Sequence, residues 1–282
     1  MKQAAIVIAV LGISAGAWAQ DKPATQSAPS AQATPAVQGK RAPAAKTQPE
    51  FDAYKAALQL TDPAGAEKAA EDFSAKFPDS ELRVVLYKSA MQKYQANADK
   101  MLEMAQKSLA IDPDDPEALV TASQVMAEKT RDTDLDRDQK LAEAKKDAER
   151  ALVTVDSDVP TAGYPPEKID QFKRFIRSEA YAILGTLASN AKNYAEAETD
   201  LRKSVEAFPE QVDPVAVLRL AIVLDMQNKY SDALKYANQA VDLTKNQPDS
   251  AAAKAAHSEQ DRLTKLSSGS APGQSAPAPQ KN

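Results

Sequence analysis

The chain has 282 residues, no cysteine and a single histidine, and its formal net charge at pH 7 is −5. Without cysteine it has no disulfide, no thiol nucleophile and no thiolate ligand for a metal, and one histidine cannot form a zinc-binding pair. An acidic chain is also a poor candidate for nucleic acid, which requires basic surfaces. We therefore expect a protein without a cofactor or metal.

Residues 1–19 are typical of a secretory signal peptide. Lys2 supplies the positive charge, an apolar run covers residues 4–17 with decreasing strength, and Ala17-Trp18-Ala19 has the small residues of a cleavage site. The run is far shorter than the ~20 residues that span a bilayer. We expect cleavage after Ala19 and a periplasmic or secreted protein with no transmembrane segment left. An uncleaved membrane anchor is the alternative.

Two flanking segments, residues 20–46 and 267–282, consist largely of Ala, Pro, Gln and Ser. They bury too little apolar surface to offset the entropy of ordering, so we expect disordered, extended arms. Between them, residues 47–266 are rich in Ala, Leu, Lys, Glu and Asp and poor in Gly, which favours helices.

A pattern of paired helices recurs through this region at a period of about 34 residues. The first three copies, residues 47–80, 81–115 and 116–157, are degenerate. Their helices are marked at helical spacing by Phe51, Tyr54, Leu58, Ala66, Ala70 and Phe73; by Val84, Tyr87, Lys88, Met91, Met101, Ala105 and Ser108; and by Leu119, Ala122, Ser123, Met126, Ala144, Ala148 and Ala151.

The third copy has an insert of about nine residues between its helices, relative to the period of the pattern. The ligand spacing of an EF-hand calcium loop is met there by Asp132, Asp134, Asp136 and Glu143. However, Arg137 stands where that loop needs Gly, and Gln139 replaces its packing residue. The alternative is a solvated charge run that begins a helix, with Asp138 as N-cap, so we predict no metal site.

Two proline-containing segments separate copies. Residues 112–116, Asp-Pro-Asp-Asp-Pro, predict a turn in which Asp caps the next helix and Pro sets its first turn. Residues 156–177 then interrupt the array. Pro166 favours a helix start and apolar residues follow at helical spacing, so we expect a helix from near Glu167.

The fourth and fifth copies, residues 178–211 and 214–247, are the clearest. With Ser178 as position 1, positions 4, 7, 8, 11, 20, 24, 27 and 32 hold Tyr181, Leu184, Gly185, Ala188, Ala197, Leu201, Ser204 and Pro209. In the fifth copy the first seven of these positions hold Val217, Leu220, Ala221, Leu224, Ala233, Ala237 and Ala240. Gly185 predicts a close approach of the paired helices, and Pro209 ends the second helix. Residues 250–266 predict a capping helix with a polar outer face.

This pattern resembles the tetratricopeptide repeat, and the chain resembles an exported bacterial protein of that family. The resemblance implies an all-α fold, an α-solenoid (right-handed superhelix) of antiparallel helix pairs with disordered N- and C-terminal arms. An ordinary helical bundle with coincidental spacing is the alternative.

In that family the first helix of each pair lines a concave groove that binds partners. The resemblance places in this groove Gln124, Glu128, Glu179, Ile183, Thr186, Asn190, Leu218, Arg219, Ile222 and Asp225. The Lys and Asn residues that grip a terminal carboxylate in the family's best-known groove are missing. The groove is fairly apolar, which suits a helix or an extended segment of a partner. Alternatively, Ile183, Leu218 and Ile222 contact the preceding repeat.

We therefore expect a non-catalytic scaffold of the cell envelope or periplasm that binds protein or peptide partners. An accessory subunit of an envelope biogenesis or secretion assembly is the alternative, and a hydrolase with an unrecognised site is a third. No catalytic residue is assigned, because the single histidine, His257, lies on the predicted capping helix with no nucleophile identified beside it. The sequence leaves the oligomeric state open.

Overall fold

The computed structural model describes residues 40–161 and 163–267, and within these ranges all regular elements are helical. The predicted signal peptide, residues 20–39 of the predicted N-terminal arm and residues 268–282 lie outside them. The chain divides into two compact units, which in the described ranges are residues 40–180, the N-terminal unit, and residues 181–267, the C-terminal unit. The predicted all-α fold of helix pairs is confirmed.

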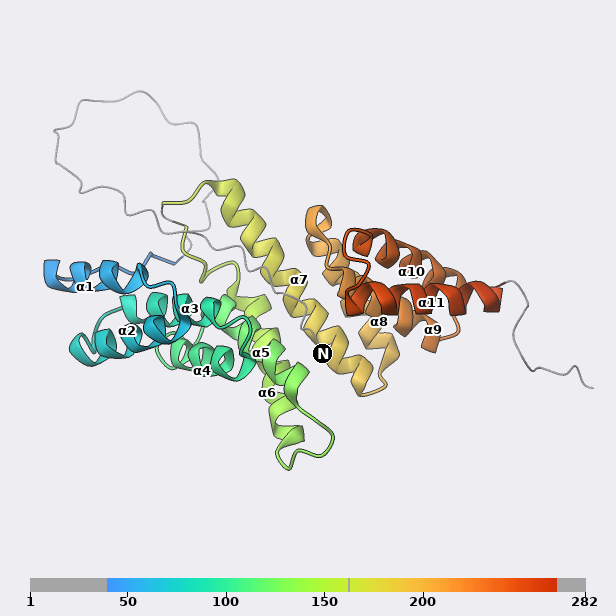
Figure 1. The fold of residues 1–282 in the computed structure, drawn as a ribbon, viewed down its shortest axis with the longest axis horizontal. Helices are drawn as coiled ribbons and strands as arrows, with labels where there is room; N and C mark the ends of the chain where they lie inside the picture. Colours follow the sequence, from blue (N-terminus) through green and yellow to red (C-terminus); the bar gives the residue numbers. More distant parts are fainter. Residues whose placement is uncertain (1–39, 162, 268–282) are drawn as a thin grey trace, which may run out of the picture. The chain divides into compact units, whose positions relative to one another are not determined.

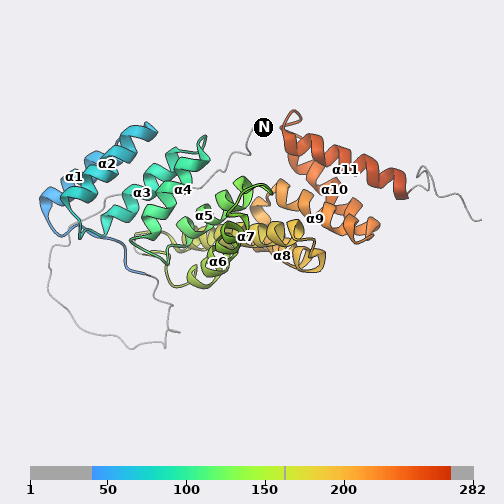
Figure 2. The same cartoon turned by 90° about the horizontal axis from the view of Figure 1, so that it is seen from below.

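In the N-terminal unit each helix from α1 to α6 contacts the next, and the pairs α1/α2, α3/α4 and α5/α6 lie side by side (Figures 1 and 2). Its helices are α1 Gln48–Leu58, α2 Pro63–Lys76, α3 Leu82–Lys93, α4 Ala98–Leu109, α5 Pro116–Lys129, α6 Arg137–Thr154 and the first part of α7 Pro166–Asn190. The start of α7 at Pro166 agrees with the helix expected from near Glu167.

Side-chain caps explain where several of these helices begin. The Thr47 hydroxyl and the Glu50 carboxylate form a reciprocal capping box at α1. Asp115 accepts a bond of 2.9 Å from the Ala118 backbone N–H, and Pro116 occupies the first turn of α5. The predicted role of residues 112–116 as a capped turn between helix pairs is therefore confirmed.

The core of the N-terminal unit lies where the periodic residues predict it. The fully buried alanines of the second helices, such as Ala70, Ala105 and Ala148, let neighbouring helices approach, while Met91 and Leu119 fill the space between them. Phe51, Leu58 and Lys88 are only half-buried.

The C-terminal unit contains the end of α7, then α8 Tyr194–Ala207, a short 3-10 helix Pro209–Gln211, α9 Pro214–Met226, α10 Tyr230–Thr244 and α11 Ala251–Ser267. Helix α11 contacts both α9 and α10. It is the predicted capping helix, and it ends at Ser267, the first residue of the predicted tail.

Equivalent positions of the two clear repeats adopt equivalent conformations. The turns after α7 and α9 each contain a residue with positive φ, Lys192 at 62° and Asn228 at 60°. In each turn the next backbone N–H donates to a carbonyl five residues earlier, from Asn193 to Ala188 and from Lys229 to Leu224, both at 2.9 Å. The turns inside these two helix pairs thus match in backbone detail.

Gly185 makes the close approach that its position predicts. A Cβ atom added there would lie 2.6 Å from Cγ of Leu201, which is itself fully buried on α8. Only a residue without a side chain leaves room for α8 at this distance from α7. No helix in the part of the chain that the structure describes is long and apolar enough to cross a membrane.

Candidate partner-binding faces

The predicted groove residues of the N-terminal unit surround a face that is already filled. Glu117, Val120 and Thr121 of α5 are buried, and Phe175 and Ile176 of α7 line the same small space. The enclosed volume is about 10 Å³, at the lower limit for one water molecule. Of the predicted residues, Gln124 and Glu179 line this space half-buried, so the face is closed to a partner segment.

Only Glu128 of this predicted set is exposed in the N-terminal unit. It lies near the end of α5 and accepts a bond of 3.3 Å from the Gln124 side-chain amide. One exposed glutamate does not make a groove.

An ionic cluster of two buried carboxylates and the largely covered side chain of Lys88, which the sequence did not indicate, lies beside the closed face. Lys88 Nζ of α3 lies 2.8 Å from Asp115 Oδ2 and 3.1 Å from Glu117 Oε2. Gln92 donates to the second oxygen of Glu117 at 2.6 Å. Burial disfavours the ammonium, but the two carboxylates outweigh it, so the pKa of Lys88 is raised and the side chain stays charged. The cluster joins α3 to α5.

Two tyrosines extend this cluster. Tyr164, from the predicted proline-rich interruption, is half-buried, and burial raises its pKa while the charge of Lys88 opposes the rise. Burial, with a smaller effect of Tyr164, raises the pKa of Tyr54 on α1 to about 12. Both phenols therefore remain neutral, and Tyr164 lies within electrostatic reach of α1, α3 and α5.

The last residues of the predicted N-terminal arm have defined positions and are held by charge. Lys40 Nζ lies 2.5 Å from Asp112 and 3.3 Å from Asp158, and its backbone N–H donates to Ser157 at 2.8 Å. Arg41 donates to both oxygens of Glu81 at 2.7 and 2.8 Å. Residues 40–46 therefore belong to the N-terminal unit, which corrects the boundary expected from composition.

In the C-terminal unit, three of the predicted groove residues are buried. Ile183 and Leu218 are 5% and 6% exposed, and Leu218 belongs to a core cluster with Ala256 of α11. Asp225 is 8% exposed and forms an ion pair with Arg262 of α11. The capping helix covers part of α9, so the prediction that Leu218 and Asp225 face a partner is wrong.

The remaining predicted residues of this unit differ in exposure. Asn190 is exposed at the end of α7, and Thr186 is half-buried with its hydroxyl donating to the Ala182 carbonyl at 2.7 Å. Arg219 and Ile222 are half-buried on α9. Met226 lies one turn beyond Ile222 and is 54% exposed.

Arg219, Ile222 and Met226 lie at spacing i, i+3 and i+7 and therefore share one face of α9, which we call the α9 stripe. Arg219 has no ion pair or hydrogen bond with another described residue, whereas most described arginines have one. The stripe combines accessible apolar surface with an unpaired cation.

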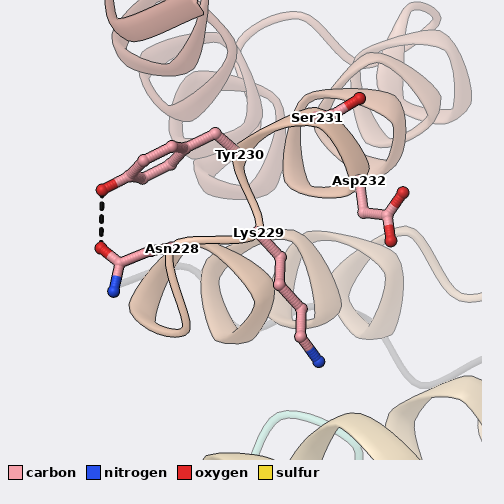
Figure 3. A pocket seen from close by; sticks show the side chains of 5 residues that line it. All are labelled: Asn228, Lys229, Tyr230, Ser231 and Asp232. Carbon is pink, nitrogen blue, oxygen red and sulfur yellow. Dashed lines mark hydrogen bonds between the residues drawn. The ribbon is translucent and has the colours of Figure 1, made fainter.

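The turn between α9 and α10 forms a shallow surface hollow of about 420 Å³, lined by Asn228, Lys229, Tyr230, Ser231 and Asp232 (Figure 3). The Tyr230 hydroxyl donates to the Asn228 side-chain oxygen at 2.6 Å, and both side chains point outward from the ribbon. The hollow is wide and open, so it does not enclose a ligand.

The acidic insert does not have the backbone of an EF-hand loop. Helix α6 begins at Arg137, in the middle of the ligand spacing where that loop needs its sharp turn. The Arg137 guanidinium binds Asp132 at 3.1 Å, and Asp134 accepts the Arg131 backbone N–H at 3.1 Å. No group of three or more metal-binding side chains gathers in the described residues. The predicted N-cap is wrong, because Asp136 precedes α6 and Asp138 lies in its first turn.

His257 is exposed on α11.

No family model matches the chain, and no curated protein matches it in sequence. Among solved structures, the assembly chaperone of RpL4 (residues 1–338) is similar at 14% identity over 78% of this chain and 90% of that chain. Its TM-score is 0.32, a similarity too low to carry an argument about fold or function.

Proposed function

We propose that this protein is a non-catalytic scaffold that binds a segment of a partner protein on the α9 stripe. The observation that carries the proposal is Arg219, which pairs with no described residue, beside the exposed Met226 and the partly exposed Ile222, whose other side packs against the core cluster of Leu218. Exposed methionine and arginine are enriched where proteins bind one another, and an apolar surface with a free cation suits an amphipathic segment that carries a carboxylate.

The α9 stripe is a better candidate than the N-terminal unit because it needs no rearrangement. A partner on the first-helix face of the N-terminal unit would have to displace Phe175 and Ile176 from α5. Met226 is exposed and Ile222 is partly exposed without any such displacement. The partner-binding residues that we propose are therefore Arg219, Ile222 and Met226, fewer than the ten residues predicted.

A peptide-selection experiment tests this proposal. Peptides selected from a displayed library against the full chain should lose affinity about tenfold or more with Arg219→Glu or Met226→Asp, because a repulsive charge or a desolvated carboxylate then faces the ligand. Glu128→Lys on α5 is the matched control for an exposed charge change and should leave affinity unchanged. Equal losses in all three variants, or no selectable peptide, would reject the α9 stripe as a binding site.

Membership of the tetratricopeptide repeat family and location in the periplasm or outside the cell are also part of the proposal. The first is supported by the burial of the periodic residues, the close contact at Gly185 and the equivalent turns. The second is supported by the signal-peptide pattern of residues 1–19. Sequencing the N-terminus of the mature protein from a periplasmic extract should give Gln20; an intact Met1 in the membrane fraction would contradict export by cleavage.

A further inference from the structure

The loop between α5 and α6 presents one leucine to solvent. Leu135 is the most exposed large apolar residue described, at 107% of its reference area, in a chain segment that projects from the helix pair (Figure 1). Four aspartates and two arginines lie within residues 131–138, so carboxylates surround the leucine and the segment is net acidic. Nothing in the N-terminal unit accounts for a leucine in this position.

This loop is held in one conformation by its own bonds. The Asp134 backbone N–H donates to the Arg131 carbonyl at 3.1 Å, and the Arg137 N–H donates to the Asp134 carbonyl at 3.2 Å. The Arg137 side chain also binds Asp138 at 2.8 Å. Leu135 is therefore displayed by an ordered loop, and little conformational entropy is lost when a partner covers it.

The α9 stripe has the complementary chemistry. It offers apolar contact through Met226 and the exposed part of Ile222, and a cation, Arg219, that pairs with no carboxylate among the described residues. The loop offers an uncovered leucine and carboxylates whose ion pairs are exposed: Asp132 and Asp138 are 96% and 94% exposed, and Asp136, paired with Lys140 at 3.0 Å, is 52% exposed. Such exposed pairs are weak and can exchange partners at little cost.

We propose that Leu135 and its neighbouring aspartates bind the α9 stripe of a second copy of this chain. The proposal rests on the α9 stripe being a binding site and assigns its occupant. Leu135 would contact Ile222 and Met226, and Asp136 would face Arg219. Because the two surfaces differ, each copy has one of each, and the contact is head-to-tail, so that chains of copies grow with concentration.

Two complementation variants test this inference directly. The full chain should self-associate with increasing concentration in sedimentation velocity, and added salt should weaken the association because it screens the exposed loop aspartates from Arg219. Leu135→Ser should weaken it by about tenfold to a hundredfold, the effect of exposing one leucine side chain. Arg219→Glu should weaken it as well. Val153→Ser is the matched control, because Val153 is 77% exposed on α6 of the same unit and should be neutral.

Mixing the two variants gives the decisive result. Leu135→Ser retains an intact stripe and Arg219→Glu retains an intact loop, so the mixture should form one-to-one dimers and no longer species. A mixture that stays monomeric, a full chain that is monomeric at every concentration, or an equal effect of Val153→Ser would overturn the inference. If selected peptides still bind the stripe in those cases, the proposed function stands and only its occupant is wrong.

Discussion

The two units differ in the residue at a position of the first helix that faces the neighbouring helix. At position 8 of its first helix the second copy, in the N-terminal unit, has Lys88, whose charge is neutralised by Asp115 and Glu117 inside the unit. At the same position the fourth copy, in the C-terminal unit, has Gly185, which lets Leu201 approach instead. In the first unit the ionic cluster lies beside a closed face, whereas in the second unit the buried Asp225 pairs with Arg262 of the capping helix and the cation Arg219 stays accessible. The position of a cation in the repeat therefore decides whether it stabilises the fold or is available to a partner.

The largest expected effect separates these two cations. Lys88→Met leaves Asp115 and Glu117 buried without a counter-charge and should lower the free energy of unfolding by about 3–5 kcal/mol. Arg219→Met removes a cation that pairs with no described residue and should change it by no more than about 0.5 kcal/mol. Urea unfolding followed by circular dichroism at pH 7 measures both.

The control for this pair keeps the shape and removes the acids as well. Lys88→Met combined with Asp115→Asn and Glu117→Gln should recover part of the lost stability, because no unpaired carboxylate remains. If Lys88→Met and Arg219→Met cost the same, the distinction between a structural and an available cation fails.

The sequence predicted the helix pairs well because helical spacing and small residues determine them locally. Gly185, Leu201 and the alanines of the second helices lie where their spacing places them. The site was predicted less well, because exposure depends on tertiary neighbours. Asp225 looks like a groove residue in the repeat pattern, yet Arg262, far along the chain, pairs with it.

The ionic cluster of the N-terminal unit was missed for the same reason. The acidic turn at residues 112–116 indicated a helix cap, and Asp115 is one. Its second oxygen binds Lys88, which no local pattern joins to it. The only signal in the sequence was Lys88 itself, at a position where the repeat favours a small residue. This signal does not say which carboxylates pair with the lysine, because that depends on the tertiary structure.

A second effect tests the packing device of the C-terminal unit. Gly185→Ala should destabilise the protein by about 1–3 kcal/mol, because the added methyl group overlaps Leu201. In a Leu201→Ala background the same substitution should cost less, since the clashing side chain is gone. A thermal-denaturation double-mutant cycle measures this coupling. Additive losses would show that Gly185 matters for its backbone and not for the approach of α8.

A smaller effect concerns Asp147, a carboxylate of the N-terminal unit that is not paired as Asp115 and Glu117 are with Lys88. Burial, and then the charge of Glu143, raises the pKa of Asp147 on α6 to about 6. Because its pKa is raised in the folded state, the folded protein binds this proton more tightly than the unfolded chain does. The stabilisation by proton binding at Asp147 is therefore complete below about pH 4 and is lost as the pH rises through 6.

Asp147→Asn should therefore stabilise the protein at pH 7 by about 1 kcal/mol, a value reduced for its partial exposure, and have no effect below pH 4. Melting temperatures of both proteins between pH 4 and pH 8 should diverge as pH rises. A constant difference across this range would mean that the gain comes from shape and not from removing a desolvated charge.

The smallest expected effect concerns an exposed ion pair of the N-terminal unit. Arg41 binds both oxygens of Glu81, but its side chain is 67% exposed and that of Glu81 is 45% exposed. Water and salt screen such a pair, so Arg41→Ala should cost about 0.5 kcal/mol at low salt and nothing at high salt. Urea unfolding at two salt concentrations checks this. A loss of unfolding free energy as large as that of Lys88→Met would contradict this expectation. It would mean that burial of an ion pair does not determine how much the pair stabilises this unit.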